Sequence, residues 1–207
     1  MLYPKTNPFM RWIFKTYVKR LVGGYFNEFI YNDIAVDKNK SVLLIANHFS
    51  FWDGLILFYL NDKLLKKNFH VMILQETAQK TGMLRYGGAF SVNKNSRDVL
   101  LSLDYAAGLL KNPGNLVLMF PQGKLFSNFV SHIHFEQGIL KLVQKARGSF
   151  QMVFAASFVQ FFKHKKPSAT VYLKVADDTA NTLDELQKNY QQHYDACKLL
   201  QTEIDIA

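Results

Sequence analysis

The sequence is poor in the features that mark secreted and membrane-spanning proteins. It has a single cysteine, Cys197, which excludes an internal disulfide and is typical of a reducing compartment such as the cytosol. It has no uninterrupted apolar run of about 18 residues, so we expect the short runs at 41–46 and 55–60 to be core elements. The first residues, MLYPK, lead into basic and aromatic residues without the apolar stretch of a signal peptide.

The composition does not fit a disordered chain. Proline occurs five times in 207 residues, no long tract is compositionally biased, and apolar residues make up 49% of the chain. This length suits one domain that buries a core without disulfides or metals. A formal charge of +9 and a pI near 9.5 predict an anionic partner, either nucleic acid, a phospholipid surface or a phosphorylated substrate.

Residues 8–26 have the pattern of a basic amphipathic helix. Its apolar residues follow helical spacing and its cations occupy much of the remaining surface: Phe9, Trp12, Ile13, Tyr17 and Leu21, with Arg11, Lys15, Lys19 and Arg20. Such a helix suits the headgroup region of an anionic bilayer. The alternative is a helix packed on its own domain with a solvated cationic face. We expect residues 1–34 to form a helical segment at a membrane surface.

Short apolar runs alternate with helical patterns, which predicts an α/β fold with a central mixed, largely parallel sheet flanked by helices. The expected strands are 41–46, 69–74, 90–92, 116–120, 151–161 and 169–175. The expected helices are 54–59, 96–110 with Ser96 as N-cap, 135–146 and 182–203. No repeat or linker is visible. We therefore expect a single domain over residues 1–207, with a catalytic α/β core at 41–175 and a closing helix at 182–203.

A histidine and an aspartate stand where the first core strand ends. The run at 41–46 leads directly into Asn47 and His48, and a strand end carries such side chains to the crevice where α/β sheets bind ligands. Asp53 follows five positions later, so it can fold back and accept the ring N–H, which fixes the tautomer and stabilises the imidazolium. The pair is a candidate general base, although this spacing alone also arises by chance.

Other candidate sites are weaker. His132 and His134 could bind a metal from a strand, but no acidic or cysteine cluster completes the site, so we expect no metal. Gly87 and Gly88 are not followed by the Gly-Lys-Ser/Thr sequence of a phosphate-binding loop.

Residues 47–53, with the sequence NHFSFWD, form the first of four blocks spread along the core. The others are GGAFSVNK at 87–94, LMFPQGK at 118–124 and FEQG at 135–138. In this order, the blocks resemble the signature of the lysophospholipid and glycerol-phosphate acyltransferase superfamily. The resemblance covers most of residues 41–160.

The resemblance implies transfer of a fatty acyl group from a coenzyme A or acyl-carrier-protein thioester to a hydroxyl of a lysophospholipid-like acceptor. In that scheme His48 removes the hydroxyl proton and Asp53 supports it, with no covalent acyl-enzyme and no cofactor besides the donor substrate. The chain agrees, because it has no Gly-x-Ser-x-Gly elbow and Cys197 lies in the expected final helix. The expected partners are the donor, the lipid acceptor and an anionic membrane, with the enzyme peripheral at the cytoplasmic face and without nucleic acid.

The sequence departs from the family pattern in two of the blocks, and these departures concern acceptor binding. Gln122 stands where the family has glutamate, and Lys124 stands where it has threonine. The arginine expected after the second block is also absent, which leaves a lysine or a later arginine to bind phosphate, although lysine lacks the planar fork of arginine. The resemblance thus predicts these substrate-binding residues: Asn47, Ser50, Lys94, Arg97, Phe120, Pro121, Gln122, Gly123 and Lys124.

Three alternatives remain open at this point. The Gln122 departure motivates a non-catalytic lipid-binding protein on the same scaffold, or an acyltransferase for another acceptor such as an ornithine lipid, a glycolipid or a pigment. A nucleic-acid binder rests on charge alone.

Several phenylalanines either line an acyl channel or, as we favour, fill the core: Phe126, Phe129, Phe135, Phe158, Phe161 and Phe162.

Overall fold

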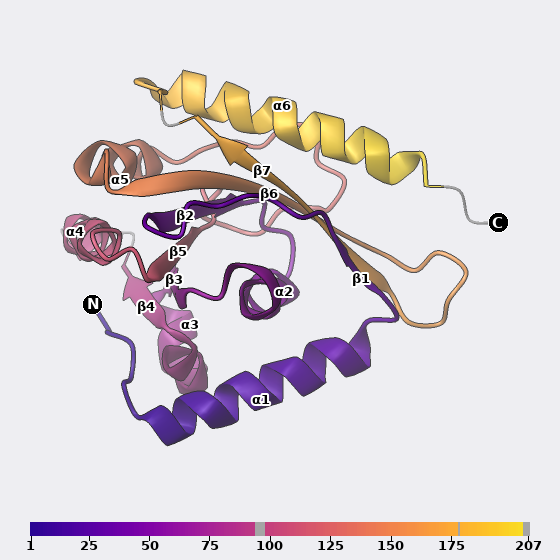
Figure 1. The fold of residues 1–207 in the computed structure, drawn as a ribbon, viewed down its shortest axis with the longest axis horizontal. Helices are drawn as coiled ribbons and strands as arrows, with labels where there is room; N and C mark the ends of the chain where they lie inside the picture. The colour runs from indigo at the N-terminus through magenta and orange to yellow at the C-terminus, as the bar shows by residue number, and fades with distance from the viewer. Residues whose placement is uncertain (94–97, 178, 205–207) are drawn as a thin grey trace.

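The computed structural model describes residues 1–93, 98–177 and 179–204 (Figure 1). The strands form one 7-stranded sheet and are β1 Phe29–Tyr31, β2 Ser41–Ala46, β3 Asn68–Leu74, β4 Ala89–Val92, β5 Asn115–Met119, β6 Phe150–Gln160 and β7 Ser168–Ala176. The helices are α1 Pro8–Tyr25, α2 Trp52–Leu60, α3 Gln75–Lys80, α4 Asp98–Leu109, α5 Gly138–Ala146 and α6 Leu183–Thr202, with a π-helical turn at Asn61–Leu65 and a 3-10 helix at Gly82–Gly87. The N-cap expected at Ser96 lies outside the described residues.

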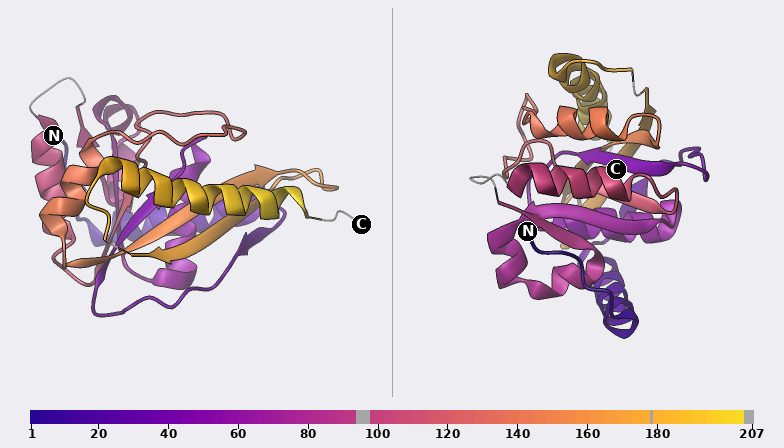
Figure 2. Two further views of the ribbon diagram at one scale, coloured as in Figure 1. Left: turned by 90° about the horizontal axis from the view of Figure 1, so that it is seen from above. Right: turned by 90° about the vertical axis from the view of Figure 1, so that its left-hand side faces the viewer.

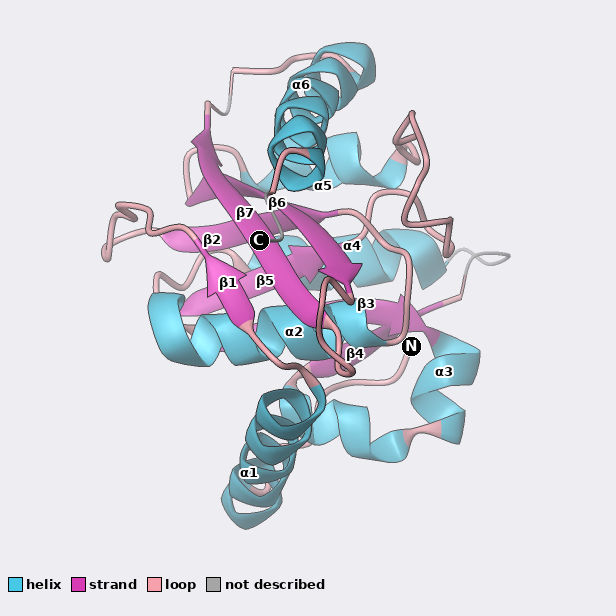
Figure 3. Ribbon diagram, turned by 90° about the vertical axis from the view of Figure 1, so that its right-hand side faces the viewer, coloured by secondary structure: helices cyan, strands magenta, loops and turns pink. Residues whose placement is uncertain are grey.

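The sheet confirms the predicted α/β architecture (Figure 3). Its strand order is β1-β7-β6-β2-β5-β3-β4, and all neighbours pair in parallel except β6 and β7. Every residue of β2 and β5 is buried. Strands of this kind are near-continuous apolar runs because helices cover both faces of a parallel sheet.

Successive residues of β2 point to opposite faces of the sheet, and each face carries its own layer of hydrophobic core. Leu43 and Ile45 pack on the face covered by α4, α5 and α6, whereas Val42 and Leu44 pack on the face covered by α1 and α2. The views in Figures 1 and 2 show α6 and α1 on opposite sides of the sheet.

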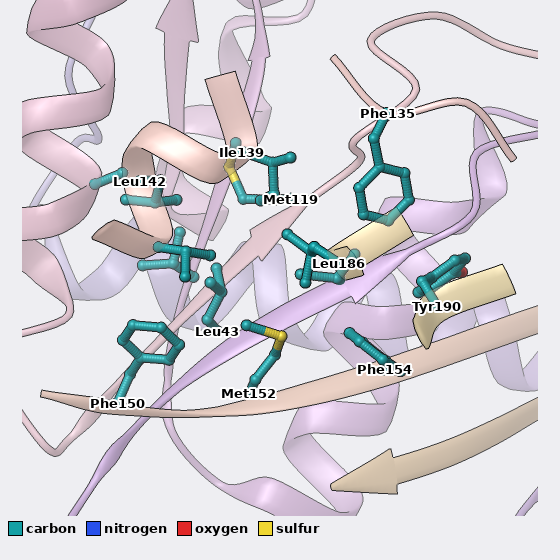
Figure 4. Close-up of a cluster of buried hydrophobic side chains, with 14 of the residues drawn as sticks. Leu43, Met119, Phe135, Ile139, Leu142, Phe150, Met152, Phe154, Leu186 and Tyr190 are labelled. Atoms are coloured by element: carbon teal, nitrogen blue, oxygen red, sulfur yellow. The ribbon is translucent and has the colours of Figure 1, made fainter. Parts of the chain in front are cut away.

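The core beneath α5 and α6 is densely filled by aromatic and aliphatic side chains (Figure 4). Tyr190 lies fully buried there, and its hydroxyl donates to the carbonyl of Ala155 at 2.7 Å. Burial raises the pKa of this phenol well above its usual value. Phe135 and Phe158 belong to the same cluster, which agrees with a core role for these two residues.

The sequence predicted an apolar stripe on α1 that differs from the stripe that packs. The buried residues of the helix are Phe14, Val18 and Val22, at i, i+4 and i+8. Phe9 and Trp12 point away from the domain, with 66% and 62% of their surface exposed. The helix therefore packs on its own domain through one face and presents aromatic residues and cations on the other.

Strand β1 corrects the expectation of a helical segment through residue 34. The helix ends at Tyr25, after Gly23 and Gly24, and the chain then turns into the edge of the sheet. The carbonyl of Glu28 accepts from Ala169 at 3.0 Å, and β1 pairs in parallel with β7. A 3-residue strand at a sheet edge carries too weak a periodicity to be found from the sequence.

Gly88 ends the 3-10 helix with a φ of +95°, where a Cβ would lie 1.9 Å from the carbonyl oxygen of Phe69. We expect Gly88→Ala to cost more stability than Gly148→Ala. Gly148 has a comparable φ of +81° but no neighbour within 4 Å, so its substitution costs only the left-handed conformation, about 1–2 kcal/mol. Denaturant unfolding of both variants measures the difference. Equal losses would show that the close approach at Gly88 carries no additional energy.

Candidate active site

His48 and Asp53 form a hydrogen-bonded pair at the carboxyl end of β2. The strand ends at Ala46, which places His48 just beyond the sheet, and Asp53 lies in the first turn of α2. His48 Nδ1 lies 2.7 Å from Asp53 Oδ2. Since a carboxylate accepts hydrogen bonds, Nδ1 carries the proton and Nε2 keeps its lone pair. This is the tautomer of a general base.

The carboxylate of Asp53 is buried and held from several directions. Its Oδ2 also accepts from the backbone N–H groups of Phe49 at 2.7 Å and Ser50 at 2.9 Å, and its Oδ1 accepts from Ser50 Oγ at 3.0 Å. The N-terminus of α2 favours a negative charge at the same place. The side chain of Asp53 is therefore held in one orientation, and it orients the imidazole in turn.

The neighbouring strand β5 supplies the second support of His48. Phe120 follows β5 and stacks on the imidazole, with ring centroids 4.1 Å apart and an interplanar angle of 15°. The His48 backbone N–H donates to Gln122 Oε1 at 2.7 Å, and the His48 carbonyl accepts from Phe126 N–H at 3.0 Å. Because β2 and β5 pair in parallel, their carboxyl ends bring the first and third sequence blocks together.

Gln122 contacts the backbone of His48 through its oxygen, and only 2% of its surface is exposed. We expect Gln122→Leu to lower the free energy of unfolding by about 1–3 kcal/mol, since it leaves a buried N–H without an acceptor. Gln122→Glu keeps an acceptor oxygen and should cost less. Denaturant unfolding compares the two variants. A Gln122→Glu loss as large as that of Gln122→Leu would contradict this role.

Asn47 ties the end of β2 to β6. Its Nδ2 donates to the Ser157 carbonyl at 2.9 Å, and its Oδ1 accepts from the Ser157 N–H at 2.8 Å. The side chain is buried, so both polar atoms serve the strand rather than the solvent. Asn47 thus sets the position from which His48 projects.

A cavity of about 750 Å³ begins at His48 and extends toward α1. Such a volume is within the range of small-molecule sites. Its lining is mainly apolar and comes from α1, α2, β3, α3, the 3-10 helix, β4, α4, β5, α5 and the loops after β2 and β5; the large apolar side chains include Phe14, Phe51, Leu55, Phe58, Phe69, Met72, Ile73, Leu74, Leu84, Leu103, Met119, Phe120 and Ile139. The arrangement joins one imidazole to a large apolar space.

The wall at α1 is closed by a tight contact. Phe14 packs so closely on Gly87 that a Cβ at this glycine would lie 2.2 Å from the ring. Near His48, by contrast, the lining includes polar residues, namely Ser50, Lys124 and Glu136. The cavity thus has a polar, reactive end and an apolar end.

A family model described as Acyltransferase matches residues 28–174. The chain belongs to the acyltransferase family. This confirms the relationship predicted from the four blocks, and the acyltransferase is an enzyme of the acyl-transferring class.

The acyltransferase is also similar to a solved structure, the 1-acyl-sn-glycerophosphate (LPA) acyltransferase PlsC from Thermotoga maritima. The TM-score is 0.64 at 15% identity, and the alignment covers 94% of this chain and 81% of that one. At this identity the likeness establishes a common fold. Among curated protein sequences, none matches this chain.

The predicted site residues of the acyltransferase fall into three groups. Ser50, Phe120, Pro121, Gly123 and Lys124 line the cavity together with His48. The side chains of Asn47 and Gln122, for which the resemblance predicted substrate contacts, bond to backbone groups, Asn47 to those of Ser157 and Gln122 to the N–H of His48. Lys94 and Arg97 lie outside the described residues.

The wall of the cavity contains residues that the sequence analysis missed. Phe14, Phe58 and Phe69 line it, whereas none of the six phenylalanines considered for an acyl channel, and expected instead in the core, does so. The i, i+4, i+8 spacing of Phe14, Val18 and Val22 in the sequence indicates the buried face of α1. The more aromatic stripe that begins at Phe9 led to the wrong face being predicted as the apolar one.

Other reactive groups lie away from the cavity. Cys197 is buried in α6, and burial raises the pKa of its thiol to about 12, so it is not a ready nucleophile. Within residues 1–93, 98–177 and 179–204, no group of three or more His, Cys, Asp or Glu side chains could hold a metal.

Proposed function

We propose that this enzyme transfers a fatty acyl group from a thioester to a hydroxyl of a lysophospholipid-like acceptor, with His48 as the general base. The observation that carries the proposal is the His48–Asp53 pair, held at 2.7 Å, at the polar end of a 750 Å³ apolar cavity. Family membership supports acyl transfer, and the 1-acyl-sn-glycerophosphate acyltransferase activity of PlsC supports a glycerophosphate acceptor.

The geometry supports a direct transfer. His48 Nε2 takes the proton of the acceptor hydroxyl as its oxygen attacks the thioester carbonyl, and the Asp53 carboxylate stabilises the imidazolium that forms. When the carbon–sulfur bond breaks, the imidazolium returns the proton to the departing thiolate. The products are an ester and a thiol, and the base is regenerated without a covalent acyl-enzyme.

The apolar part of the cavity suits the acyl chain. Burial contributes about 0.8 kcal/mol for each methylene group removed from water. The acyl carbonyl then lies at the polar end, near His48, and the chain extends along the wall that includes Phe58 and Phe69 toward Phe14. The donor is proposed as a coenzyme A or acyl-carrier-protein thioester.

Lys124 supports an acceptor with a negative charge. It lies exposed at the cavity with its ammonium 5.2 Å from the ring centroid of Phe126. A phosphate beside the reacting hydroxyl would meet this cation, and Lys94 and Arg97 remain proposed as further contacts. Ornithine lipids, glycolipids and pigments are the alternative acceptors.

The proposal is tested by incubating the purified enzyme with thioesters of both carriers and with a panel of lysolipids, while following free thiol and new ester by mass spectrometry. Ester formation coupled to thiol release is the expected result. If none of the lysolipids supports thiol release, the result would instead favour the alternative function of a lipid-binding protein. Gln122 no longer favours that alternative, because it supports His48 through an oxygen that glutamate also provides.

We further propose that α1 attaches the enzyme to an anionic bilayer as a peripheral protein. Phe9 and Trp12 stack at 6.2 Å on the outward face of a helix that also carries exposed cations such as Arg11 and Arg20. Aromatic and basic residues in this arrangement suit the headgroup region. In the part of the chain that the structure describes, no helix is long and apolar enough to cross a membrane.

We expect the double variant Phe9→Ser/Trp12→Ser to bind anionic vesicles at least roughly tenfold more weakly, because full burial of each ring is worth about 1.5–3 kcal/mol. Vesicle sedimentation measures this binding. The control is Leu100→Ser/Leu101→Ser, which removes exposed apolar residues from α4 on the other side of the sheet. Equal binding by the two variants would place the contact elsewhere. Substitution is preferable to deletion of α1, whose inner face belongs to the core.

A further inference from the structure

The turn between β6 and β7 carries an unusual concentration of positive charge. Residues 161–167 have the sequence FFKHKKP, which includes three lysines and a histidine. Phe161 is 58% exposed although it is a large apolar residue. The acyl-transfer chemistry uses none of these side chains. An exposed aromatic ring beside a cluster of cations matches the outward face of α1 in chemical character.

The backbone of this turn is held in an uncommon conformation. Phe162 has a φ of +48°, in the left-handed region that bulky side chains rarely adopt. The turn is closed by a hydrogen bond from the His164 N–H to the Phe161 carbonyl at 3.1 Å. Strain of this kind persists where the surrounding structure fixes it, and it is concentrated at functional segments. Here it accompanies the exposure of Phe161.

The turn lies directly against the C-terminal end of α1 (Figures 1 and 3). Lys166 Nζ donates to the carbonyl of Gly24 at 2.7 Å, and the N–H of Asn27 donates to the carbonyl of Pro167 at 2.8 Å. The turn and α1 are thus joined by direct contacts.

The same surface continues to the cavity. Tyr25 of α1 stacks on Trp52 with centroids 4.2 Å apart, and Trp52 contacts Phe51 at 6.4 Å. Phe51 lines the cavity and is 62% exposed. A chain of direct contacts therefore links the basic turn, the end of α1 and the rim of the cavity.

We propose that the β6–β7 turn is a second contact with an anionic lipid bilayer, with Phe161 in the headgroup region and the lysines on lipid phosphates or carboxylates. This rests on the proposed action of the enzyme at a membrane. Charge complementarity and continuity with α1 identify the bilayer as the occupant. Two contacts fix the orientation of the molecule where a single helix leaves it free to roll, so the rim at Phe51 is held toward the lipid.

The test is the double variant Phe161→Ser/Lys165→Glu of the full chain, with vesicles of phosphatidylcholine alone or mixed equally with phosphatidylglycerol. Both residues are exposed, and the variant keeps Lys166 and the strained Phe162. Binding to the mixed vesicles should fall by roughly tenfold or more, from the reversed charge together with the lost ring. The matched control, Leu101→Ser/Lys188→Glu, makes the same charge change on the opposite face, at a leucine that is also 58% exposed. It should bind as the wild type does.

Wild-type binding by the turn variant overturns the proposal. So does a variant that binds vesicles normally but loses turnover only with a carrier-protein thioester, since the turn would then dock an acidic protein. The single variant Lys165→Glu repeats the test if the double variant melts earlier than the wild type. Acyl transfer by the wild type in detergent micelles is measured separately, so a failure of the proposed reaction is distinguished from a failure of this contact.

Discussion

Replacing His48 with alanine is expected to lower kcat for acyl transfer by roughly 10²–10⁴-fold, the usual contribution of a positioned general base. The variant removes the only imidazole that lines the cavity in the described part of the chain. It leaves Asp53 with its contacts to Phe49 and Ser50, so the turn into α2 keeps its anchor. Initial rates of thiol release with a saturating acceptor measure the effect.

The matched control is His134→Ala, since His134 is exposed and does not line the cavity. It should turn over as the wild type does. Vesicle binding and thermal unfolding of His48→Ala should also stay close to wild-type values, which separates lost chemistry from lost structure. Undiminished turnover in a correctly folded His48→Ala would remove the main support for the mechanism.

Asp53→Asn is expected to reduce kcat by a comparable amount, up to about 10⁴-fold. The amide keeps the volume of the side chain but carries no charge to stabilise the imidazolium. The backbone N–H groups of Phe49 and Ser50 that donate to Oδ2 keep the amide oxygen at that position, so the NH₂ group faces Ser50 Oγ and the imidazole retains an acceptor. The expected loss therefore comes from the missing negative charge beside the imidazolium.

Ser50→Ala provides a graded comparison, because it removes one hydrogen bond to Oδ1 and leaves the charge. A typical hydrogen bond contributes about 0.5–1.5 kcal/mol, so we expect a loss of roughly tenfold or less. Steady-state kinetics of both variants, with unfolding curves as the structural control, test the order. A Ser50→Ala loss as large as that of Asp53→Asn would mean that the geometry of the turn, rather than the charge, limits the reaction.

The contact between His48 and Asp53 could be predicted because its determinants are local. An apolar, β-branched run indicates the buried strand β2, and the residues after it necessarily stand at the sheet edge. Asp53 follows within one turn of helix, so the contact with His48 needs no knowledge of distant segments. The same locality explains why most strand positions agree with the expected ranges to within one or two residues.

The cavity could not be predicted in this way, since its walls come from segments far apart in the chain. Phe14 and Gly87 meet only because α1 crosses beneath the sheet. The role of Gln122 depended equally on tertiary structure, because its bond to the His48 N–H spans 74 positions. A family pattern assigned it to the acceptor, whereas the parallel pairing of β2 and β5 turns it toward the backbone.

Helix α1 is at once a wall of the cavity, through Phe14, and an outer surface, through Phe9 and Trp12. Because successive residues are offset by about 100° around a helix, deletion of one residue between Trp12 and Phe14 would turn the outer stripe by that angle relative to the wall. Substitutions can change the cavity wall or the outer surface separately, whereas an insertion or deletion also changes the angle between them. The helical phase between the two stripes is therefore a heritable constraint on this enzyme, separate from the identity of any residue in either stripe.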